Sequence, residues 1–453
     1  MVGSKPYKAL FFLFQYHPLH IILNFKVAAF VIVLKRHTRF FLIGIITMTL
    51  SACIEPFTAE TQTFENALVV DALLTNELRR HTVKLSRTYT FESEGPIAES
   101  NAQVQISDDM GSSYLFRETD SGIYTAIEIF SAIPGRSYIL DITTSDGKSY
   151  ISESVIAPKN VLITDLFAER VTNDLGEEGV SIRLDNETDT DASEPTFFRY
   201  EYEETYKIIA PKYDPFKFEV IDYTPCDGNF YEVGIKPRTE EQRVCYASRK
   251  SVGIKQATTI SLTGNELSNF LVRFINREDY ILSHRYSILV RQYAQTRNAY
   301  SYYESLNDFS STESIFSDTQ PGFLFGNIFS RNDLEEKVLG YFEVSSVSEQ
   351  RIYFNYVDLF PNEELPPYAV NCDIIGNPEL VGRGYHCDGN VCDGACESPL
   401  IEAILAGIVV FHSENENISR EMPGPYFTLP SPCGDCTKLG SNIVPDFWEE
   451  KRI

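Results

Sequence analysis

The sequence predicts a mainly β fold: an N-terminal immunoglobulin-like or carboxypeptidase-regulatory-like sandwich, then a larger β-rich domain with short helices and a disulfide-rich tail. Three observations predict it. Apolar and polar residues alternate over many short segments, which is the side-chain period of a strand. Turn sequences that contain glycine or proline separate these segments. Tyr and Phe number 26 and 31 against a single Trp, a bias that suits half-buried strands.

The N-terminal part has the pattern of a targeting signal. The basic residues Lys35, Arg36 and Arg39 precede an apolar run, 40–46, which leads to Leu50-Ser51-Ala52-Cys53. A basic, an apolar and a small-residue part in this order are typical of a secretory signal peptide. The last four residues resemble the bacterial lipoprotein lipobox, which implies cleavage before Cys53 and a covalent lipid on its thiol. An apolar signal that ends near a cysteine by chance is the alternative.

The residues before this signal are apolar but interrupted by Pro18, Asn24 and Lys26. A membrane-spanning helix needs about 20 largely uninterrupted apolar residues. We therefore predict that translation starts near Val33 or Leu34 and that residues 1–32 extend the reading frame upstream; a second membrane segment is the alternative. On this interpretation residues 1–52 are an over-extended N-terminus plus signal peptide, and residues 53–64 are a tether.

The charge balance limits the kind of partner. Residues 1–52 hold six of the 39 Lys and Arg and none of the 64 Asp and Glu, so the remaining chain has 33 basic residues and a net charge of −31. Such a chain repels nucleic acid. The 43% apolar content is too high for a disordered chain. We expect a folded protein with an acidic, solvated surface and no nucleic-acid partner.

The segments after the tether are predicted as follows. Residues 65–158 form the first sandwich, residues 159–360 the larger β-rich domain, and residues 361–453 a Cys-rich tail packed on the second domain. One helix is expected over 265–274, where Leu267, Phe270, Leu271 and Phe274 have helical spacing, and another over 296–311. The strands are expected at 83–85, 102–106, 114–116, 138–142, 180–184, 197–202, 285–293, 338–344 and 350–354.

The cysteines predict disulfides rather than a metal site. Without Cys53 an even number remains, and exported chains generally oxidise their cysteines. Cys226 is favoured as the partner of Cys245, because the two lie apart from the rest, and the six in the tail are expected to pair among themselves. A zinc site with His386 is the alternative. The disulfide candidates are Cys226, Cys245, Cys372, Cys387, Cys392, Cys396, Cys433 and Cys436.

The motifs of common enzymes are missing from the sequence. It holds no His-Glu-x-x-His pair, no Gly-x-Ser-x-Gly elbow and no phosphate-binding glycine loop. Asp185, Glu187, Asp189 and Asp191 alternate as calcium ligands do, but the glycine and the glutamate of an EF-hand loop are absent, which favours an acidic surface loop. The aromatic residues in 197–206 and 300–303 are expected to be core more than binding surface. We predict no enzyme, no metal and no cofactor other than the lipid.

Several segments together resemble a known family. They are Leu68–Ala72, Asp146–Tyr150, Phe198–Tyr206, Val290–Tyr293 with Ala299, Tyr300 and Tyr303, Pro321–Ile328, Val338–Ser348, and Cys433–Trp448. In this order they resemble the DUF4249 lipoproteins of the Bacteroidota over nearly the whole chain after Cys53. Genes of this family commonly lie beside TonB-dependent outer-membrane receptors of the SusC type, and no functional residue transfers from it.

The resemblance and the lipobox together give the functional expectation. We expect a non-enzymatic lipoprotein, held in the outer membrane by the lipid on Cys53 and facing the cell surface. It would be an accessory or ligand-capture subunit of a TonB-dependent transporter. The alternatives are a structural or adhesive component of a surface assembly, and a surface hydrolase without a recognisable motif.

Overall fold

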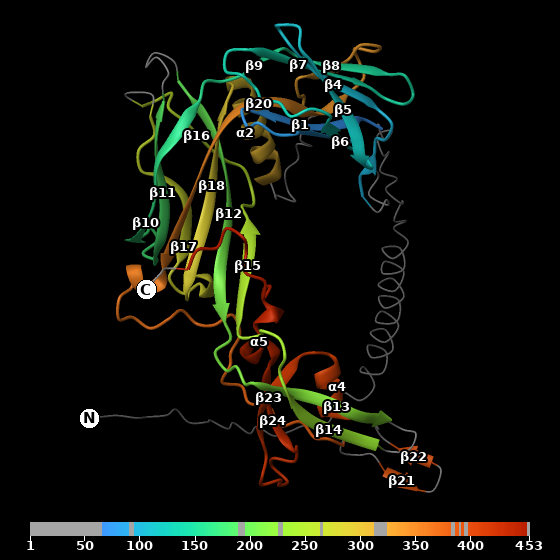
Figure 1. Ribbon diagram of the computed structural model, residues 1–453, viewed down its shortest axis with the longest axis vertical. Helices are drawn as coiled ribbons and strands as arrows, with labels where there is room; N and C mark the ends of the chain where they lie inside the picture. The colour runs from blue at the N-terminus through green and yellow to red at the C-terminus, as the bar shows by residue number, and fades with distance from the viewer. Residues whose placement is uncertain are drawn as a thin grey trace, which may run out of the picture. The chain divides into compact units, whose positions relative to one another are not determined.

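A computed structural model describes residues 66–89, 95–188, 195–224, 230–262, 266–311, 324–381, 386–388, 391–393 and 397–450 (Figure 1). The chain divides into two compact units, Met1–Phe64 and Glu65–Ile453, and all described residues belong to the second. No helix among them is long and apolar enough to cross a membrane. The proposed lipid site, Cys53, lies outside the described residues. The fold is mainly β with short helices, as the sequence predicts.

The N-terminal strands form a sheet that curls around one apolar core. The order is β20-β1-β2-β6-β5-β4-β7-β8-β19, and inward residues such as Val70, Tyr124 and Leu140 are buried. The two ends of this sheet meet, because the side-chain amide of Asn327 exchanges hydrogen bonds of 2.9 and 3.0 Å with the backbone of Phe342. The first strands are β1 (Leu68–Thr75), β2 (Thr82–Arg87), β3 (Ile97–Ala98), β4 (Gln103–Asp108), β5 (Ser113–Asp120), β6 (Ile123–Ala126), β7 (Ser137–Thr143), β8 (Ser149–Ser152) and β9 (Val155–Ile156).

The turns predicted within this sheet are present. The β4–β5 and β7–β8 connections contain Gly111 and Gly147, which have φ of +87° and +85°. Side chains rarely tolerate this left-handed conformation, so glycine suits both positions. The predicted strands 114–116 and 138–142 fall within β5 and β7, and the predicted strand 102–106 overlaps β4 from Gln103 on.

A second core lies between two layers in the middle of the chain. A three-stranded sheet, β10-β11-β17, packs against strands β15, β12, β18 and the second half of β20, and Phe198, Tyr286 and Ile182 are buried between the layers. The strands are β10 (Val161–Thr172), β11 (Glu178–Thr188), β12 (Phe197–Ile209), β15 (Val244–Lys250), β16 (Lys255–Thr258), β17 (Phe270–Asn276), β18 (Arg285–Gln295), β19 (Ile328–Ser330) and β20 (Val338–Asn355), with η1 (Tyr280–Leu282) before β18 and α3 (Tyr356–Leu359) after β20.

Strand β20 connects the two cores. Its first half pairs in parallel with β1, from Leu68 opposite Val338 to Thr75 opposite Ser345. Its second half pairs antiparallel with β18. The separate strands predicted at 338–344 and 350–354 are therefore one strand. The residues of the predicted first sandwich, 65–158, share their sheet with β19 and β20.

One of the two predicted helices is wrong. Residues 266–269 are not helical, and Phe270–Asn276 form strand β17. Tertiary packing outweighed the helical spacing of the apolar residues, because β17 completes the sheet beside β11 and buries Val272 and Ile275. Aromatic and β-branched residues suit such a strand. The helix expected over 296–311 is confirmed as α2, Arg297–Ser311.

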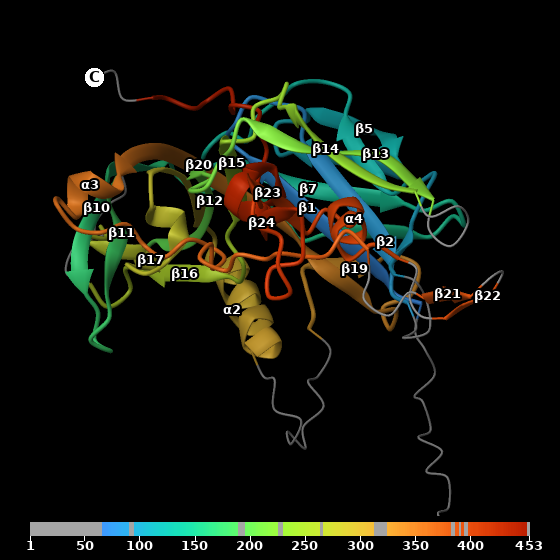
Figure 2. The same cartoon turned by 90° about the horizontal axis from the view of Figure 1, so that it is seen from below.

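The tail adds short elements beside a hairpin from the middle of the chain (Figures 1 and 2). Rings of Phe218 on the hairpin and Phe411 and Tyr426 in the tail pack edge to face, with centroids 5.4–6.0 Å apart. The elements are the hairpin β13 (Phe216–Thr224) and β14 (Phe230–Pro237), then β21 (His386–Asp388), β22 (Val391–Asp393), α4 (Pro399–Leu405), β23 (Val409–Glu414), β24 (Tyr426–Pro430), α5 (Ser431–Gly434) and η2 (Cys436–Lys438).

Disulfides are present, but the favoured pairing is wrong. Cys245 is bonded to Cys436, and Cys372 to Cys433. Cys226, the predicted partner of Cys245, lies outside the described residues. The pairing was misjudged because β15, which carries Cys245, runs next to the C-terminal segment: Tyr246 and Ser441 exchange two backbone hydrogen bonds of 2.8 Å. Cys245 and Cys436 are 191 residues apart in the sequence, but they are close in space, and this closeness decided the pairing.

Candidate functional site

Strands β12, β18 and β20 present polar side chains on the face covered by helix α2. Arg199 and Glu201 are two residues apart on β12 and share a face. Tyr293 of β18 lies directly opposite Arg199 in the antiparallel register. Helix α2 supplies Tyr303, and its neighbour Tyr302 packs on Tyr341 of β20 with ring centroids 4.8 Å apart. The strand registers and this helix therefore fix the positions of all the groups in the site.

Arg199 is a buried cation at the centre of the site, with 7% of its surface exposed. Its Nη2 donates to a Glu343 carboxylate oxygen at 3.1 Å, and its Nη1 donates to Glu201. Its guanidinium carbon lies 4.3 Å from the ring centre of Tyr293 and 4.8 Å from that of Tyr303. Cation–π contacts strengthen when water is excluded, so the two rings stabilise the buried charge. Its Nε has no hydrogen-bond partner among the residues that the structure describes.

Glu343 is the buried counter-ion, with no exposed surface. Besides Arg199, its carboxylate accepts hydrogen bonds from Gln295 Nε2 at 2.8 Å and Ser345 Oγ at 2.5 Å. A buried carboxylate is costly unless it is paired and hydrogen-bonded, and Glu343 is both. The pair is thus held by packing as well as by charge.

The site shifts the pKa of its tyrosines and of its arginine. Burial, and then the carboxylate of Glu343, raise the pKa of Tyr303 well above its ordinary value. Burial and Glu201 do the same for Tyr293. Burial alone would lower the pKa of Arg199, but the carboxylates of Glu343 and Glu201 outweigh it and raise the pKa. Both phenols stay neutral and Arg199 stays charged at any physiological pH.

A pocket of about 230 Å³ opens beside Arg199, between β12, β18, α2 and the β15–β16 connection. Its walls carry charges of both signs and three tyrosine residues. Those charges are largely engaged already, for example Arg291 with Glu349 at 2.8 Å. The lining residues are Arg199, Tyr200, Glu201, Tyr202, Glu203, Lys250, Ser251, Gly253, Ile254, Leu289, Arg291 and Tyr303.

The described lining of this pocket offers several groups that can contact a ligand. Its described lining contains no histidine or cysteine, and its hydroxyl groups belong to Ser251 and to tyrosines. The pocket offers charged groups, hydrogen-bonding groups and aromatic edges, which suit a small polar ligand.

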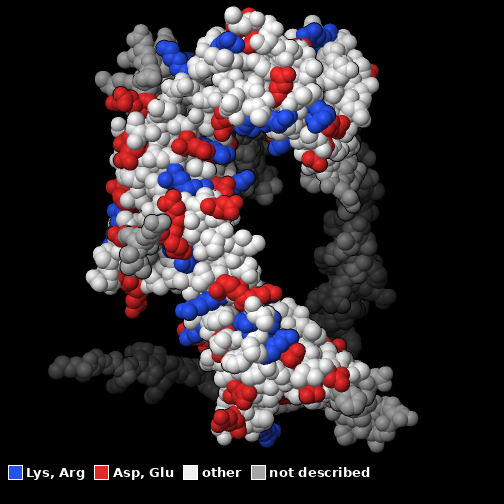
Figure 3. Space-filling view, viewed as in Figure 1, with Lys and Arg blue, Asp and Glu red and all other residues white. Residues whose placement is uncertain are grey.

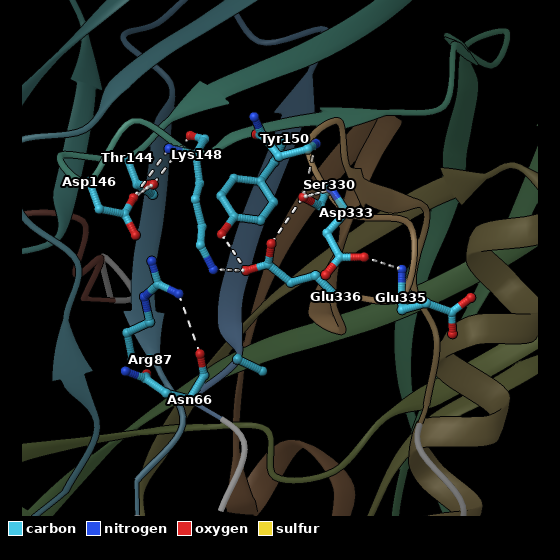
Figure 4. A network of polar contacts seen from close by, with 12 residues as sticks. Asn66, Arg87, Thr144, Asp146, Lys148, Tyr150, Ser330, Asp333, Glu335 and Glu336 are labelled. Carbon is cyan, nitrogen blue, oxygen red and sulfur yellow. Dashed lines mark hydrogen bonds and ion pairs between the residues drawn. The ribbon is translucent and has the colours of Figure 1, made fainter.

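A second polar cluster lies where the curled sheet closes (Figure 4). Lys148 and Tyr150 both point at Glu336, each 2.8 Å from the same carboxylate oxygen, and Ser330 donates to the other oxygen at 3.0 Å. Burial would raise the pKa of Glu336, but hydrogen bonds from these three residues outweigh it and lower the pKa. Both oxygens of the carboxylate are engaged, so the cluster ties β8 to the loop before β20.

The predicted site residues do not form a common centre. Cys245, Cys372, Cys433 and Cys436 are in disulfides, so they are not available as zinc ligands. Cys387 and Cys392 are paired in the backbone register of β21 and β22, while Cys53, Cys226 and Cys396 lie outside the described residues. Within the described ranges, no three His, Cys, Asp or Glu side chains are grouped to hold a metal.

The sequence analysis missed the role of Arg199 and Glu343. Both lie in segments that carry the family resemblance, but the first segment was interpreted only as aromatic core. A signal was present: Arg199 occurs within the apolar and aromatic run 197–202, and Glu343 follows Tyr341 and Phe342. A charge inside a buried strand generally needs a partner of opposite charge, but the sequence alone does not reveal which one.

Comparison with known proteins places the chain in a family. The fold and the site together define a mainly β protein. It has a buried ion pair beneath a helix and a polar pocket beside that pair. The model of the family described as "Domain of unknown function (DUF4249)" matches residues 54–351, and the chain belongs to this family.

The other comparisons add no function. No curated protein matches the chain. One solved structure, described as the complete structure of manganese lipoxygenase of Gaeumannomyces graminis and the partial structure of zonadhesin of Komagataella pastoris, is 11% identical and covers 51% of this chain and 89% of its own. Its TM-score is 0.10, so it carries no argument about fold or function.

Proposed function

We propose that the protein is a non-enzymatic, lipid-anchored accessory or ligand-capture subunit of a TonB-dependent transporter in the outer membrane. The observation that carries the proposal is the pocket beside Arg199. Its walls are charged and held rigid by the pair of Arg199 with Glu343, and they hold groups that recognise rather than react. A site of this kind on a rigid sheet binds at low conformational cost.

The anchor is supported by the order of the chain. The family match starts at residue 54, directly after Cys53, and Cys53 ends the lipobox-like sequence. About 12 residues separate Cys53 from the first described residue, Asn66, and an extended chain of that length spans about 40 Å. The folded unit would then stand clear of the lipid headgroups, within reach of a membrane receptor.

The transporter partnership can be tested by affinity purification. The full-length protein with a C-terminal tag is expressed in its own cells, and the outer membrane is solubilised in mild detergent. We expect a TonB-dependent receptor to co-purify at near-equal stoichiometry. The Cys53→Ser variant, which has no thiol to acylate, should leave the membrane fraction and recover much less receptor.

Two outcomes would overturn the proposal. Recovery of the protein alone, or with components of a surface assembly, would favour the structural or adhesive function. Retention of Cys53→Ser in the membrane at wild-type level would contradict the lipid anchor.

A further inference from the structure

A second pocket lies where the β9–β10 connection meets the starts of β12 and α2. Its volume is about 620 Å³, within the range of small-molecule sites. It is distinct from the pocket beside Arg199, because the two share no lining residue. Four parts of the chain line it: Gly135, residues 156–159 with Val161, residues 195–197, and residues 294–297.

The floor of this pocket is apolar. Val161, Ala157, Phe197 and Ala294 are each at most 8% exposed, so they form a fixed surface. Ile156 at the edge is 59% exposed, which is high for a large apolar residue. A ligand that covers this surface would remove apolar area from water and gain about 25 cal/mol for each Å².

The rim of the pocket is basic. Lys159 and Arg297 are lining residues, and no Asp or Glu is among the described residues that line it. This is unusual in a chain with 64 acidic and 39 basic residues; on the face seen in Figure 3, the two signs are interspersed. Within the described part of the chain neither cation has an ion-pair partner. Arg297 stacks on Phe197 at 5.1 Å.

The side chain of Gln295 in the wall is already engaged. Gln295 is 4% exposed, its Nε2 donates to Glu343 at 2.8 Å, and its Oε1 accepts from Gln256 at 3.4 Å. An apolar body suits the floor, and a negative group suits the rim.

We propose that this pocket binds an apolar molecule that carries one carboxylate, of the kind represented by a medium-chain fatty acid. The apolar body lies against Phe197 and Val161, and the carboxylate lies between Lys159 and Arg297. The inference deepens the proposed function by naming a ligand class, but binding can be measured without any receptor. Charge-assisted hydrogen bonds from both cations would orient the ligand.

The test is calorimetric titration of the chain from residue 54 on, which contains the whole compact unit Glu65–Ile453. The probes are decanoate and decyltrimethylammonium, which have equal chain length and opposite charge, both below their micelle concentrations. We expect decanoate to bind at least about tenfold more tightly, and its affinity to fall with added salt because the rim charges are exposed. Equal affinities for the two probes would overturn the proposal.

Variants locate the site. The double variant Lys159→Gln with Arg297→Gln should weaken decanoate binding at least about tenfold, because two charge-assisted contacts are lost. The matched control is Lys236→Gln with Arg331→Gln, which removes the same charge from two exposed positions elsewhere and should bind as wild type. Ile156→Asp should also weaken decanoate, since it places a negative charge at the rim. Unchanged binding in the first variant, with a wild-type melting curve, would overturn the proposal.

Discussion

At the scale of single residues, the pair of Arg199 and Glu343 makes a sharp stability prediction. Glu343→Gln leaves Arg199 buried with only the half-exposed carboxylate of Glu201. Removal of one partner of a buried ion pair costs about 3–5 kcal/mol, because a buried charge is left uncompensated. We expect the free energy of unfolding, measured by urea denaturation, to fall by that amount.

The same strand offers a matched control for this prediction. Glu349 of β20 pairs with Arg291 at 2.8 Å, but both side chains are about half exposed. Glu349→Gln should therefore cost at most about 1 kcal/mol. Arg199→Met combined with Glu343→Leu should recover most of the loss, since both charges are gone. Equal effects of Glu343→Gln and Glu349→Gln would show that burial does not matter here.

At the scale of elements, the parallel pairing of β1 with β20 depends on Gly340. Its φ is +98°, and a Cβ at this position would lie 1.8 Å from the carbonyl oxygen of Val70 on β1. Gly340→Ala must therefore push the two strands apart as well as strain the backbone. We expect Gly340→Ala to lower the free energy of unfolding by at least about 2 kcal/mol more than left-handed backbone strain alone would.

The control for strain is Gly176, in the turn between β10 and β11. Its φ is +79°, but a Cβ there would meet nothing within 4 Å. Gly176→Ala should cost only the left-handed strain, about 1–2 kcal/mol. The comparison is made by urea unfolding of both variants. If the two lose the same stability, close packing of β1 on β20 is not the reason for glycine at position 340.

The elements also show what sequence reasoning reaches and where it stops. Alternation and turn residues are local signals, and they located β4, β5, β7 and β18 well. The helix expected over 265–274 failed because β11 offered that segment a strand partner. Pairings between distant segments leave no local signal, so the parallel match of β1 with β20 and the contact of Arg199 with Glu343 could not be predicted. The polar pocket is lined by segments distant in the sequence, and it was missed for the same reason.

At the scale of the whole molecule, the disulfide of Cys245 with Cys436 holds the C-terminal segment against β15. Trp448, the only tryptophan, packs on Tyr246 of that strand with ring centroids 4.9 Å apart and is 8% exposed. Replacing both cysteines by Ala should lower the free energy of unfolding by about 2–5 kcal/mol, since the link closes a long loop. Tryptophan fluorescence reports the change directly: an early loss of its buried emission in urea would mark release of the segment.

The competing pairing supplies the control for this prediction. If Cys245 is bonded to Cys436, Cys226→Ala leaves this link intact and the Trp448 emission keeps its wild-type midpoint in urea. If instead Cys245 is bonded to Cys226, Cys226→Ala shifts the midpoint as much as Cys245→Ala does. Mass spectrometry of the unreduced digest gives an independent answer, because a peptide that joins Cys226 to Cys245 would contradict the fold at the C-terminus.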